Sequence, residues 1–539
     1  MKGLMQHDAL LVNRILERAV TMFPEQEIVT KAKDGVHRET FAAFGVRVNR
    51  LASALHALGV EPGDRVASFA FNTWRHQELY FAAPCMGAVL HTLNIRLHPD
   101  QIAWIVNHAE DRVICVDAAL LPLLAVIAPK LTTVTHVVVM GECDRSALPK
   151  SLDYEELLAG AATTFAWPEP DEGDAAAMCY TSGTTGHPKG VVYSHRSTYL
   201  HAMAINLGSC LGLTDRDAVL PVVPMFHANA WGVPYAALMS GAKLVLAGAF
   251  SADPACLADL IEAERVTMTC GVPTVWTALL HYLEKTPRNL SSLRLVTVGG
   301  SAVPVSMIAA FKRLVGVDVV QGWGMTETGP VASLSTLTPE MEARPEAERF
   351  ELRARQGRVI PGVRFRIRTG GGVDVPWDDQ TMGELQVRGN WVAGSYYNDP
   401  TSGERFDDGW LRTGDIAVVD TNGSLRLVDR AKDLVKSGGE WISSVELESA
   451  LVGHPDVLEA AVVGVPHEKW GERPLACVVL RPGVQTTSEE LLVFLCTKVV
   501  KWWLPDEIVF ITEVPKTSVG KYDKKVLRER FRERYGASA

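Results

Sequence analysis

The chain reads Tyr-Thr-Ser-Gly-Thr-Thr-Gly-His-Pro-Lys-Gly from Tyr180 to Gly190. Apolar runs at 175–180 and 191–193 flank this stretch and predict a strand on each side. Glycines let the backbone N–H groups of such a turn face an anion, and hydroxyls add further donors. The stretch therefore predicts a polyphosphate-binding loop. Its expected ligand-binding residues are Thr181, Ser182, Gly183, Thr184, Thr185 and Lys189.

This loop differs from the common P-loop, in which Ser or Thr follows the lysine and a helix comes next. Here Gly190 follows Lys189, and the chain continues as a predicted strand. The alternative interpretation is an ordinary surface turn rich in Ser, Thr and Gly. Eleven consecutive residues of this composition favour the phosphate-binding loop over that alternative.

Helical and strand-like patterns alternate on both sides of the loop, which predicts a wound α/β fold. We expect two α/β layers with the loop between them, followed from about residue 357 by a small antiparallel barrel or sheet. A compact α+β unit then begins after a short charged segment, 429–433, which we interpret as a hinge. The expected division is an N-terminal domain, 1–429, and a mobile C-terminal domain, 430–539. The expected helices are 9–22, 39–58, 75–87, 100–108, 231–239, 255–264, 304–314, 444–452, 488–497 and 522–534, and the strands include 66–71, 89–94, 112–117, 218–223, 243–247, 294–298, 317–320, 364–368, 383–388, 416–419, 424–428, 457–464, 475–480 and 507–512.

The bulk composition excludes several classes of protein. Basic residues number 53 and acidic residues 63, and the net charge of -10 argues against nucleic acid as the main partner. Nine cysteines without a Cys-x-x-Cys pair predict neither a disulfide framework nor a metal site, and they fit a reducing cytosol. The first residues lack the apolar core of a signal peptide, and no apolar run reaches the roughly 18 residues of a membrane span. We therefore expect a cytoplasmic protein without a transmembrane segment.

Two further stretches carry residues suited to nucleotide chemistry. The predicted strand 317–320 leads into Gln-Gly-Trp-Gly-Met-Thr-Glu-Thr, where Trp323 offers a flat face for adenine and Glu327 a hard oxygen ligand for Mg²⁺. Asp415 follows a tight turn, and a fixed aspartate can accept from both ribose hydroxyls. The alternatives are a capped turn with a packed tryptophan and an aspartate that only forms a turn.

Together these motifs resemble those of the acyl-adenylate-forming enzymes, a superfamily of acyl-CoA synthetases, peptide-synthetase adenylation domains and firefly-type luciferases. The resemblance covers nearly the whole chain and is closest to bacterial medium- and long-chain fatty acyl-CoA synthetases. It implies that Trp323 stacks on adenine, that Glu327 binds Mg²⁺ with Thr181 or Thr184, and that Asp415 and Arg430 reach the ribose or the phosphates. It also implies nucleotide contacts at Gly300, Ser301, Gln321, Gly322 and Thr326, and acyl contacts at Gly300, Ala302 and Gly324.

The resemblance assigns two separate roles to the C-terminal part. Lys521 resembles the lysine that bridges the substrate carboxylate and the α-phosphate, where charge develops in the transition state. The stretch 434–442 resembles the loop that lines the pantetheine tunnel of coenzyme A after the domain has turned. Its expected contact residues are Lys436, Gly438, Gly439 and Trp441, and Lys432, just before the loop, is a further expected contact residue.

The acyl side is expected at residues 224–231, Pro-Met-Phe-His-Ala-Asn-Ala-Trp. No formal charge occurs from 221 to 235, so the aspartate that holds an ammonium group in amino-acid-activating relatives is missing, which argues against an amino-acid substrate. His227 corresponds to an aromatic residue near the phosphates and the carboxylate. Trp231 resembles a gate to the acyl tunnel, and plain core packing is an equally weighted alternative.

These expectations describe an ATP- and Mg²⁺-dependent acyl-CoA synthetase that forms acyl-AMP and then transfers the acyl group to coenzyme A. The favoured acid is a medium- or long-chain fatty acid, and the alternative is a short substituted acid such as 3-methylmercaptopropionate. An adenylation enzyme that loads a carrier protein and an oxidative luciferase-like enzyme are less favoured. A non-catalytic scaffold would be expected to lack Lys521 or Glu327, and both are present. A homodimer is a further expectation from the relatives.

Overall fold

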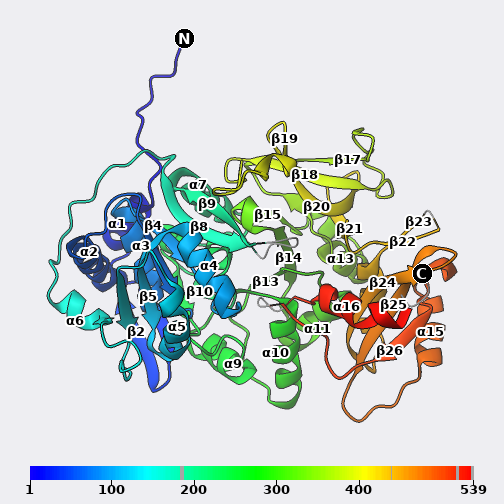
Figure 1. Cartoon of the computed structure of the whole chain (residues 1–539). Coiled ribbons are helices and arrows are strands. Elements are labelled where there is room, and N and C mark those ends of the chain that lie inside the picture. Colours follow the sequence, from blue (N-terminus) through cyan, green and yellow to red (C-terminus); the bar gives the residue numbers. More distant parts are fainter. Residues whose placement is uncertain (182–186, 439, 518–520, 536–539) are drawn as a thin grey trace.

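The computed structural model describes residues 1–535 apart from 182–186, 439 and 518–520. Two large sheets of seven and nine strands form the N-terminal part, and two five-stranded sheets follow (Figure 1). Five expected site residues, Ser182, Gly183, Thr184, Thr185 and Gly439, lie outside the described residues.

The seven-stranded sheet carries the two strands that flank the predicted phosphate loop. Its last two strands, β8 and β9, pair antiparallel from Ala175↔Ser194 to Thr181↔Lys189, while all other neighbours are parallel. The predicted strand–loop–strand arrangement is therefore confirmed at its two strands. In spatial order the sheet contains β7 (Leu152–Asp153), β6 (His136–Met140), β5 (Asp111–Asp117), β3 (Arg65–Phe69), β4 (Val89–Thr92), β8 (Ala175–Thr181) and β9 (Lys189–Ser194).

The nine-stranded sheet carries the predicted nucleotide-binding stretch that begins at Gln321. Parallel pairing runs through its centre, and antiparallel strands close both edges. In spatial order it contains β16 (Arg358–Val359), β15 (Val331–Leu334), β14 (Val319–Gly324), β13 (Leu295–Gly299), β12 (Met268–Gly271), β10 (Ala218–Pro221), β11 (Lys243–Leu246), β1 (Glu27–Ala32) and β2 (Gly35–Thr40).

Helices separate the two large sheets and cover their outer faces. One apolar cluster joins the inner faces of both sheets to α1, α2, α3, α7 and α8, and two further clusters lie on the outer faces. Adjacent strand residues divide between the clusters, as Val66 and Ala67 of β3 do, because successive side chains point to opposite faces. The helices are α1 (Val12–Met22), α2 (Phe41–Ala57), α3 (Trp74–Cys85), α4 (Pro99–Ala109), α5 (Leu121–Ile127), α6 (Tyr154–Ala159), α7 (His195–Ile205), α8 (Val233–Ser240), α9 (Pro254–Ala263), α10 (Pro273–Lys285), α11 (Val305–Val315), α12 (Pro339–Glu342) and α13 (Glu346–Arg353).

The two smaller sheets follow in sequence. The first is the expected antiparallel sheet, with β17 (Val363–Arg368), β18 (Gly383–Gly389), β19 (Phe406–Asp407), β20 (Trp410–Val419) and β21 (Leu425–Arg430). The second belongs to the C-terminal α+β unit, with β22 (Val435–Ser437), β23 (Glu440–Ile442), β24 (Val457–His467), β25 (Gly471–Leu480) and β26 (Glu507–Phe510). Its helices are α14 (Ser444–Val452), α15 (Ser488–Cys496) and α16 (Lys524–Tyr535). The predicted α/β class with a smaller C-terminal unit is confirmed.

Three local expectations were wrong. The hairpin β1–β2 was not predicted, so the helix expected at 39–58 begins only at Phe41. β14 continues through residues 321–324, beyond the predicted end of the strand at residue 320, because Gly322 and Trp323 pair with β15. The helix expected from residue 231 begins at Val233, since residues 228–232 form a left-handed turn.

All nine cysteines have free thiols. Within the described part of the chain, no helix combines the length and the apolar character needed to cross a membrane. The described residues also contain no group of three or more His, Cys, Asp or Glu side chains placed to hold a metal ion.

Candidate functional site

Asp415 and Trp323 join the antiparallel sheet β17–β21 to the nine-stranded sheet. The Trp323 indole N–H donates to Asp415 Oδ2 at 3.1 Å, and Arg430 Nε lies 2.7 Å from Asp415 Oδ1. The carboxylate is nearly inaccessible, and Gly414 before it adopts a φ of +73° that favours glycine. Burial raises the pKa of the Asp415 carboxyl, and the positive charge of Arg430 opposes this rise. Three residues expected at the nucleotide therefore meet at one point.

Lys521 reaches this same place from the C-terminal unit. Its Cε lies 3.4 Å from the position that a Cβ on Gly300 would take, directly after β13. Burial, followed by the positive charge of Arg430, lowers the pKa of the Lys521 ammonium to about 8, although Asp415 and Glu327 act in the opposite direction. The ammonium group therefore lies among carboxylates that belong to the N-terminal part.

Glu327 lies in a buried 3₁₀ turn, η4 (Thr326–Thr328), beside β8. The Tyr396 hydroxyl donates to Glu327 Oε1 at 2.7 Å, and the Tyr193 hydroxyl of β9 donates to the Thr326 carbonyl at 2.8 Å. These contacts hold the carboxylate next to the strand that ends at Thr181. The carboxylate of Glu327 and the hydroxyl of Thr181 are hard oxygen donors, so these two groups fit the ligand preference of Mg²⁺.

Lys189 of β9 pairs with the loop that precedes β19. Its Nζ lies 2.9 Å from Asp399 Oδ2, and it lies 4.8 Å above the centre of the Tyr396 ring. Hydrogen bonds from Thr401 and from Lys189 lower the pKa of Asp399 to about 2. Tyr396 thus contacts both Lys189 and Glu327, and Lys189 has a carboxylate partner in this structure.

The acyl-side stretch enters a left-handed turn, η3 (Ala228–Gly232), directly after His227. The four residues from Ala228 to Trp231 have φ between +43° and +59°, and Gly232 has a φ of +73°. Each non-glycine residue in this region costs roughly 1–2 kcal/mol, so surrounding contacts must hold the turn. Burial, followed by the charges of Lys521 and Arg96, lowers the pKa of His227 to about 3, so its imidazole is neutral at ordinary pH.

The other expected nucleotide and acyl residues lie around these groups. Gln321, Gly322 and Gly324 are in β14, Thr326 is in η4, and Ser301 and Ala302 are exposed after β13. A side chain at Gly299 would lie 2.9 Å from the Trp231 ring, which places that ring against β13.

The residues expected at the coenzyme A tunnel lie elsewhere. β22 and β23 form a hairpin at the outer side of the C-terminal unit, away from β13 and β14 (Figure 1). Lys432, Lys436, Gly438 and Trp441 are exposed there, with Trp441 at 42%. The structure therefore brings Lys521 into the site but not the hairpin.

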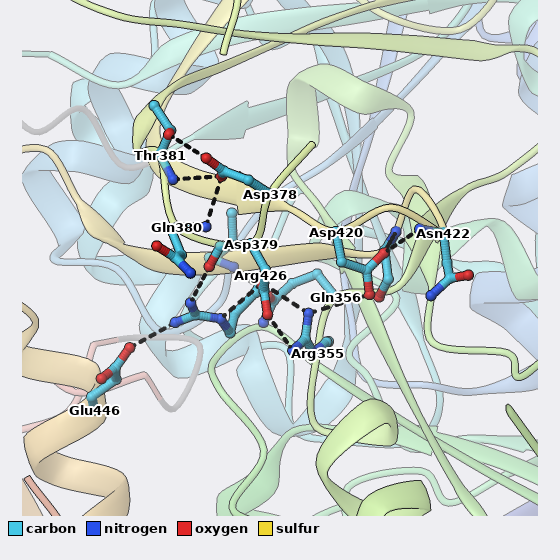
Figure 2. A network of polar contacts seen from close by, with 12 residues as sticks. Arg355, Gln356, Asp378, Asp379, Gln380, Thr381, Asp420, Asn422, Arg426 and Glu446 are labelled. Carbon is cyan, nitrogen blue, oxygen red and sulfur yellow. Dashed lines mark hydrogen bonds and ion pairs between the residues drawn. The ribbon is translucent and has the colours of Figure 1, made fainter. Parts of the chain in front are cut away.

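Polar contacts hold the C-terminal unit in this position. In Figure 2, Arg426 of β21 reaches Glu446 of α14 on one side and Asp379 on the other. Arg426 Nη1 lies 2.7 Å from Glu446 Oε1, and Arg355 Nη2 lies 2.8 Å from Asp379 Oδ2. A second contact joins Arg481 Nη1 to His281 Nε2 of α10 at 2.8 Å.

The sequence interpretation missed five residues at the site. Tyr396, Asp399 and Thr401 surround Lys189 and Glu327, and Thr92 and Cys179 contact Asn229 in the acyl-side turn. All five contacts join residues that are far apart in the chain. The short polar run after Tyr396 indicates a turn, but no local pattern indicates which lysine or carboxylate that turn meets.

Two family models match large parts of the chain. Residues 16–397 match the model of the AMP-binding enzyme family, and residues 446–521 match that of the AMP-binding enzyme C-terminal domain. A long-chain-fatty-acid–CoA ligase of Thermus thermophilus is 51% identical, covering 97% of this chain and 96% of the relative. A 3-methylmercaptopropionyl-CoA ligase of Ruegeria lacuscaerulensis is 45% identical, covering 99% of each.

Solved structures share the fold as well. The structure of an anthranilate CoA ligase in complex with anthranoyl-AMP superposes with a TM-score of 0.88 at 27% identity, covering 98% of this chain and 99% of the other. A fatty acyl CoA synthetase of Mycobacterium tuberculosis superposes with a TM-score of 0.73 at 29% identity, covering 97% and 99%. On the matched domains, the nearly full-length similarity and the shared fold, the chain belongs to the family of AMP-binding enzymes.

Proposed function

We propose that the protein is an AMP-forming acyl-CoA synthetase that activates a medium- or long-chain fatty acid. One observation carries the proposal: Lys521, from the C-terminal unit, lies near Asp415 and Glu327 of the N-terminal part, with Arg430 of the domain boundary beside them. A lysine held there can serve a reaction in which two anions, a carboxylate and ATP, must meet. The long-chain and medium-chain ligases among the relatives support the choice of acid.

In the first step of the proposed reaction, a carboxylate oxygen attacks the α-phosphorus of ATP, and the bond to the bridging oxygen of pyrophosphate breaks. Lys521 stabilises the negative charge that gathers between carboxylate and α-phosphate. Asp415 holds the ribose hydroxyls, and the neutral His227 lines the acid side of the α-phosphate. Mg²⁺, which Glu327 and Thr181 would hold, supplies further positive charge to the phosphates.

In the second step, the sulfur of coenzyme A attacks the acyl carbonyl carbon, the bond to the AMP oxygen breaks, and the thiol proton passes to solvent. Lys432, Lys436, Gly438 and Trp441, which are expected at the tunnel, are exposed and lie away from the site, so the C-terminal unit must turn before this step. We place the hinge at the boundary between residues 429 and 430, one residue before the end of β21. The Ala431 N–H donates to the Gly414 carbonyl at 2.9 Å, so backbone hydrogen bonding to the N-terminal part continues to the second residue past this boundary.

The uncharged acyl side supports an acid without an ammonium group. His227 is neutral, and residues 228–232 are Ala, Asn, Ala, Trp and Gly. A short substituted acid such as 3-methylmercaptopropionate is the second candidate, because ligases named for that acid in two Ruegeria species are 45% and 44% identical over nearly full length. A carrier-protein acceptor is less favoured, since the relatives named here are CoA ligases.

The decisive experiment measures AMP and pyrophosphate release across a panel of carboxylic acids. The panel runs from acetate to palmitate and includes 3-methylmercaptopropionate, with coenzyme A or a phosphopantetheinylated carrier protein as acceptor. We expect the highest kcat/KM with an acid of eight or more carbons and free coenzyme A. A preference for the thioether acid would select the second candidate. Turnover only with the carrier protein would contradict the proposal.

Three accompanying proposals can be tested separately. The Mg²⁺ requirement predicts loss of pyrophosphate release in excess EDTA and recovery on adding Mg²⁺. The homodimer expected from the relatives is checked by light scattering of the purified protein. The nine free thiols support a reducing compartment such as the cytoplasm, which fractionation of the source cells would check.

A further inference from the structure

The acyl-side turn adopts a conformation that its own sequence does not favour. Ala228, Ala230 and Trp231 carry side chains that disfavour a left-handed backbone, and only Asn229 is a residue type that tolerates it. A strained turn of this kind persists where surrounding contacts determine it, and such turns occur preferentially at functional sites. The contacts that hold this turn therefore indicate what it is for.

The main anchor of the turn is the Asn229 side chain. Its Oδ1 accepts from Thr92 Oγ1 at 3.2 Å and from Cys179 Sγ at 2.9 Å. Asn229 is 4% exposed and its two partners are each 2% exposed. Burial raises the pKa of the Cys179 thiol to about 11, so the thiol stays protonated and can donate. A buried carboxamide oxygen that lost both donors would lose its hydrogen bonds without gaining water.

Two further contacts hold the end of the turn. The Trp231 ring packs against Gly299, where a Cβ would lie 2.9 Å from the ring. At Gly232 a Cβ would lie 2.6 Å from His201 Nδ1, so a larger residue does not fit there. Trp231 thus lies between Asn229, whose side chain is anchored, and Gly232, which packs closely against His201 of α7.

The anchor also connects the acyl side to the nucleotide side. Thr92 ends β4, and Cys179 lies in β8, two residues before Thr181. Asn229 lies midway between His227 and Trp231, in the connection that follows β10 of the other large sheet. One carboxamide therefore fixes the acyl-side turn to the strand that leads into the phosphate-binding stretch.

We propose that Asn229 is a positioning residue for the acyl chain: held by Thr92 and Cys179, it keeps Trp231 against Gly299 and so sets which chain lengths the enzyme accepts. This inference rests on the proposed acyl-CoA synthetase function. It assigns to Asn229 no contact with the substrate, and its effect passes through Trp231.

The test separates backbone conformation from hydrogen bonding. Asn229→Gly keeps a residue that tolerates the left-handed turn but removes the carboxamide. Thr92→Val and Cys179→Ala remove one donor each and leave the sequence of the turn unchanged, whereas Cys179→Ser keeps a donor. Cys115→Ala, at another buried cysteine in β5, is the matched control for loss of a buried thiol.

The first measurement is amide hydrogen exchange at residues 227–232 in the enzyme without substrate. We expect faster exchange there in Asn229→Gly and Thr92→Val, and wild-type exchange in Cys179→Ser and Cys115→Ala. This readout requires no turnover, so it tests the anchor even if the panel of acids shows that the proposed function is wrong. Unchanged exchange in both Asn229→Gly and Thr92→Val would overturn the proposal.

The second measurement is KM for acids of increasing length and KM for ATP. Loss of one or two hydrogen bonds predicts that Asn229→Gly raises KM for the preferred acid by about 2- to 10-fold and flattens the length profile. KM for ATP should change by less than the KM for the acid. Adding Thr92→Val to Asn229→Gly should raise the KM for the acid little further, because both changes remove the same contact. Equal rises in both KM values together with a lower Tm would show that Asn229 only supports the fold, and would overturn the positioning role.

Discussion

At the scale of single residues, the charge of Lys521 depends on its surroundings. Burial lowers the pKa of its ammonium to about 8, so the group is positive below that pH and neutral above it. The proposed first step requires the positive form. The free enzyme is the species whose pKa values govern the pH dependence of kcat/KM.

We therefore predict that kcat/KM for pyrophosphate release falls as the pH rises through about 8. Lys521→Arg, whose guanidinium stays charged, should be slower because its geometry differs, but it should lack this fall between pH 7.5 and 9.5. Pyrophosphate release measured over that range checks both enzymes. Parallel profiles for the two enzymes would assign the titration to another group.

Glu327 gives a second prediction at this scale. Glu327→Ala should reduce pyrophosphate release by about 10²-fold or more, because a carboxylate that holds Mg²⁺ next to the phosphates is lost. Tyr396→Phe is the matched control, since it removes the hydroxyl 2.7 Å from Glu327 Oε1 and leaves the carboxylate in place. Rates are measured across a Mg²⁺ titration. Near-normal activity of Glu327→Ala with an unchanged Mg²⁺ dependence would remove Glu327 from the site.

The sequence could indicate Glu327 and Asp415, because each lies in a motif whose residue types suit nucleotide chemistry, whereas Lys521 was indicated by the resemblance to the acyl-adenylate-forming enzymes. It could not indicate Tyr396 or Asp399. Their partners Glu327 and Lys189 lie in other elements. Only the packing of the antiparallel sheet β17–β21 against the large sheets brings each residue to its partner.

At the scale of secondary-structure elements, hydrophobic periodicity predicted most central strands and helices, but it failed where another element decides the conformation. β14 extends through Gly324 because β15 pairs with it, and nothing local to Gln321–Gly324 reports that pairing. The left-handed turn after His227 contains no glycine before Gly232, so its own sequence does not indicate this conformation. The hydrogen bonds from Thr92 and Cys179, which are distant in the chain, hold the turn instead.

Glu446 gives a prediction for the contact between elements that Figure 2 shows. It joins α14 to Arg426 of β21, and both side chains are about a third or more exposed, at 40% and 31%. Exposed ion pairs contribute about 0–1 kcal/mol, so Glu446→Ala should slow pyrophosphate release by at most about 5-fold. Thioester formation from acyl-AMP should stay the same or rise, because the contact belongs to the arrangement with Lys521 in the site.

The matched control for Glu446→Ala is Asp420→Ala. Asp420 contacts Arg355 in the same network at 3.4 Å, within the N-terminal part. That variant should leave the ratio of the two half-reactions unchanged. A loss of both half-reactions in Glu446→Ala would indicate a defect in folding rather than in the position of the C-terminal unit.

At the scale of the whole molecule, the layers follow from the sequence pattern, and the position of the C-terminal unit does not. Alternating helices and strands predicted the two large α/β sheets, and the series of strand patterns without intervening helices after about residue 357 predicted the antiparallel sheet. Which face of the C-terminal unit meets the site depends on side-chain contacts such as Arg426–Glu446 and Arg481–His281, which no local pattern encodes. In this structure Lys521 faces the site and Trp441 is exposed.

The central claim is that the C-terminal unit serves the two half-reactions in two positions, and separate measurement of the half-reactions in Lys521→Ala tests it most directly. We predict that this variant loses pyrophosphate release by about 10²–10³-fold, as for other preorganised electrostatic groups, yet forms thioester from synthetic acyl-AMP and coenzyme A at close to the wild-type rate. Trp441→Ala, at an exposed position in this structure, should show the reverse pattern. If Lys521→Ala impairs both half-reactions equally, the claim is contradicted, and Lys521 is a structural contact between the two parts.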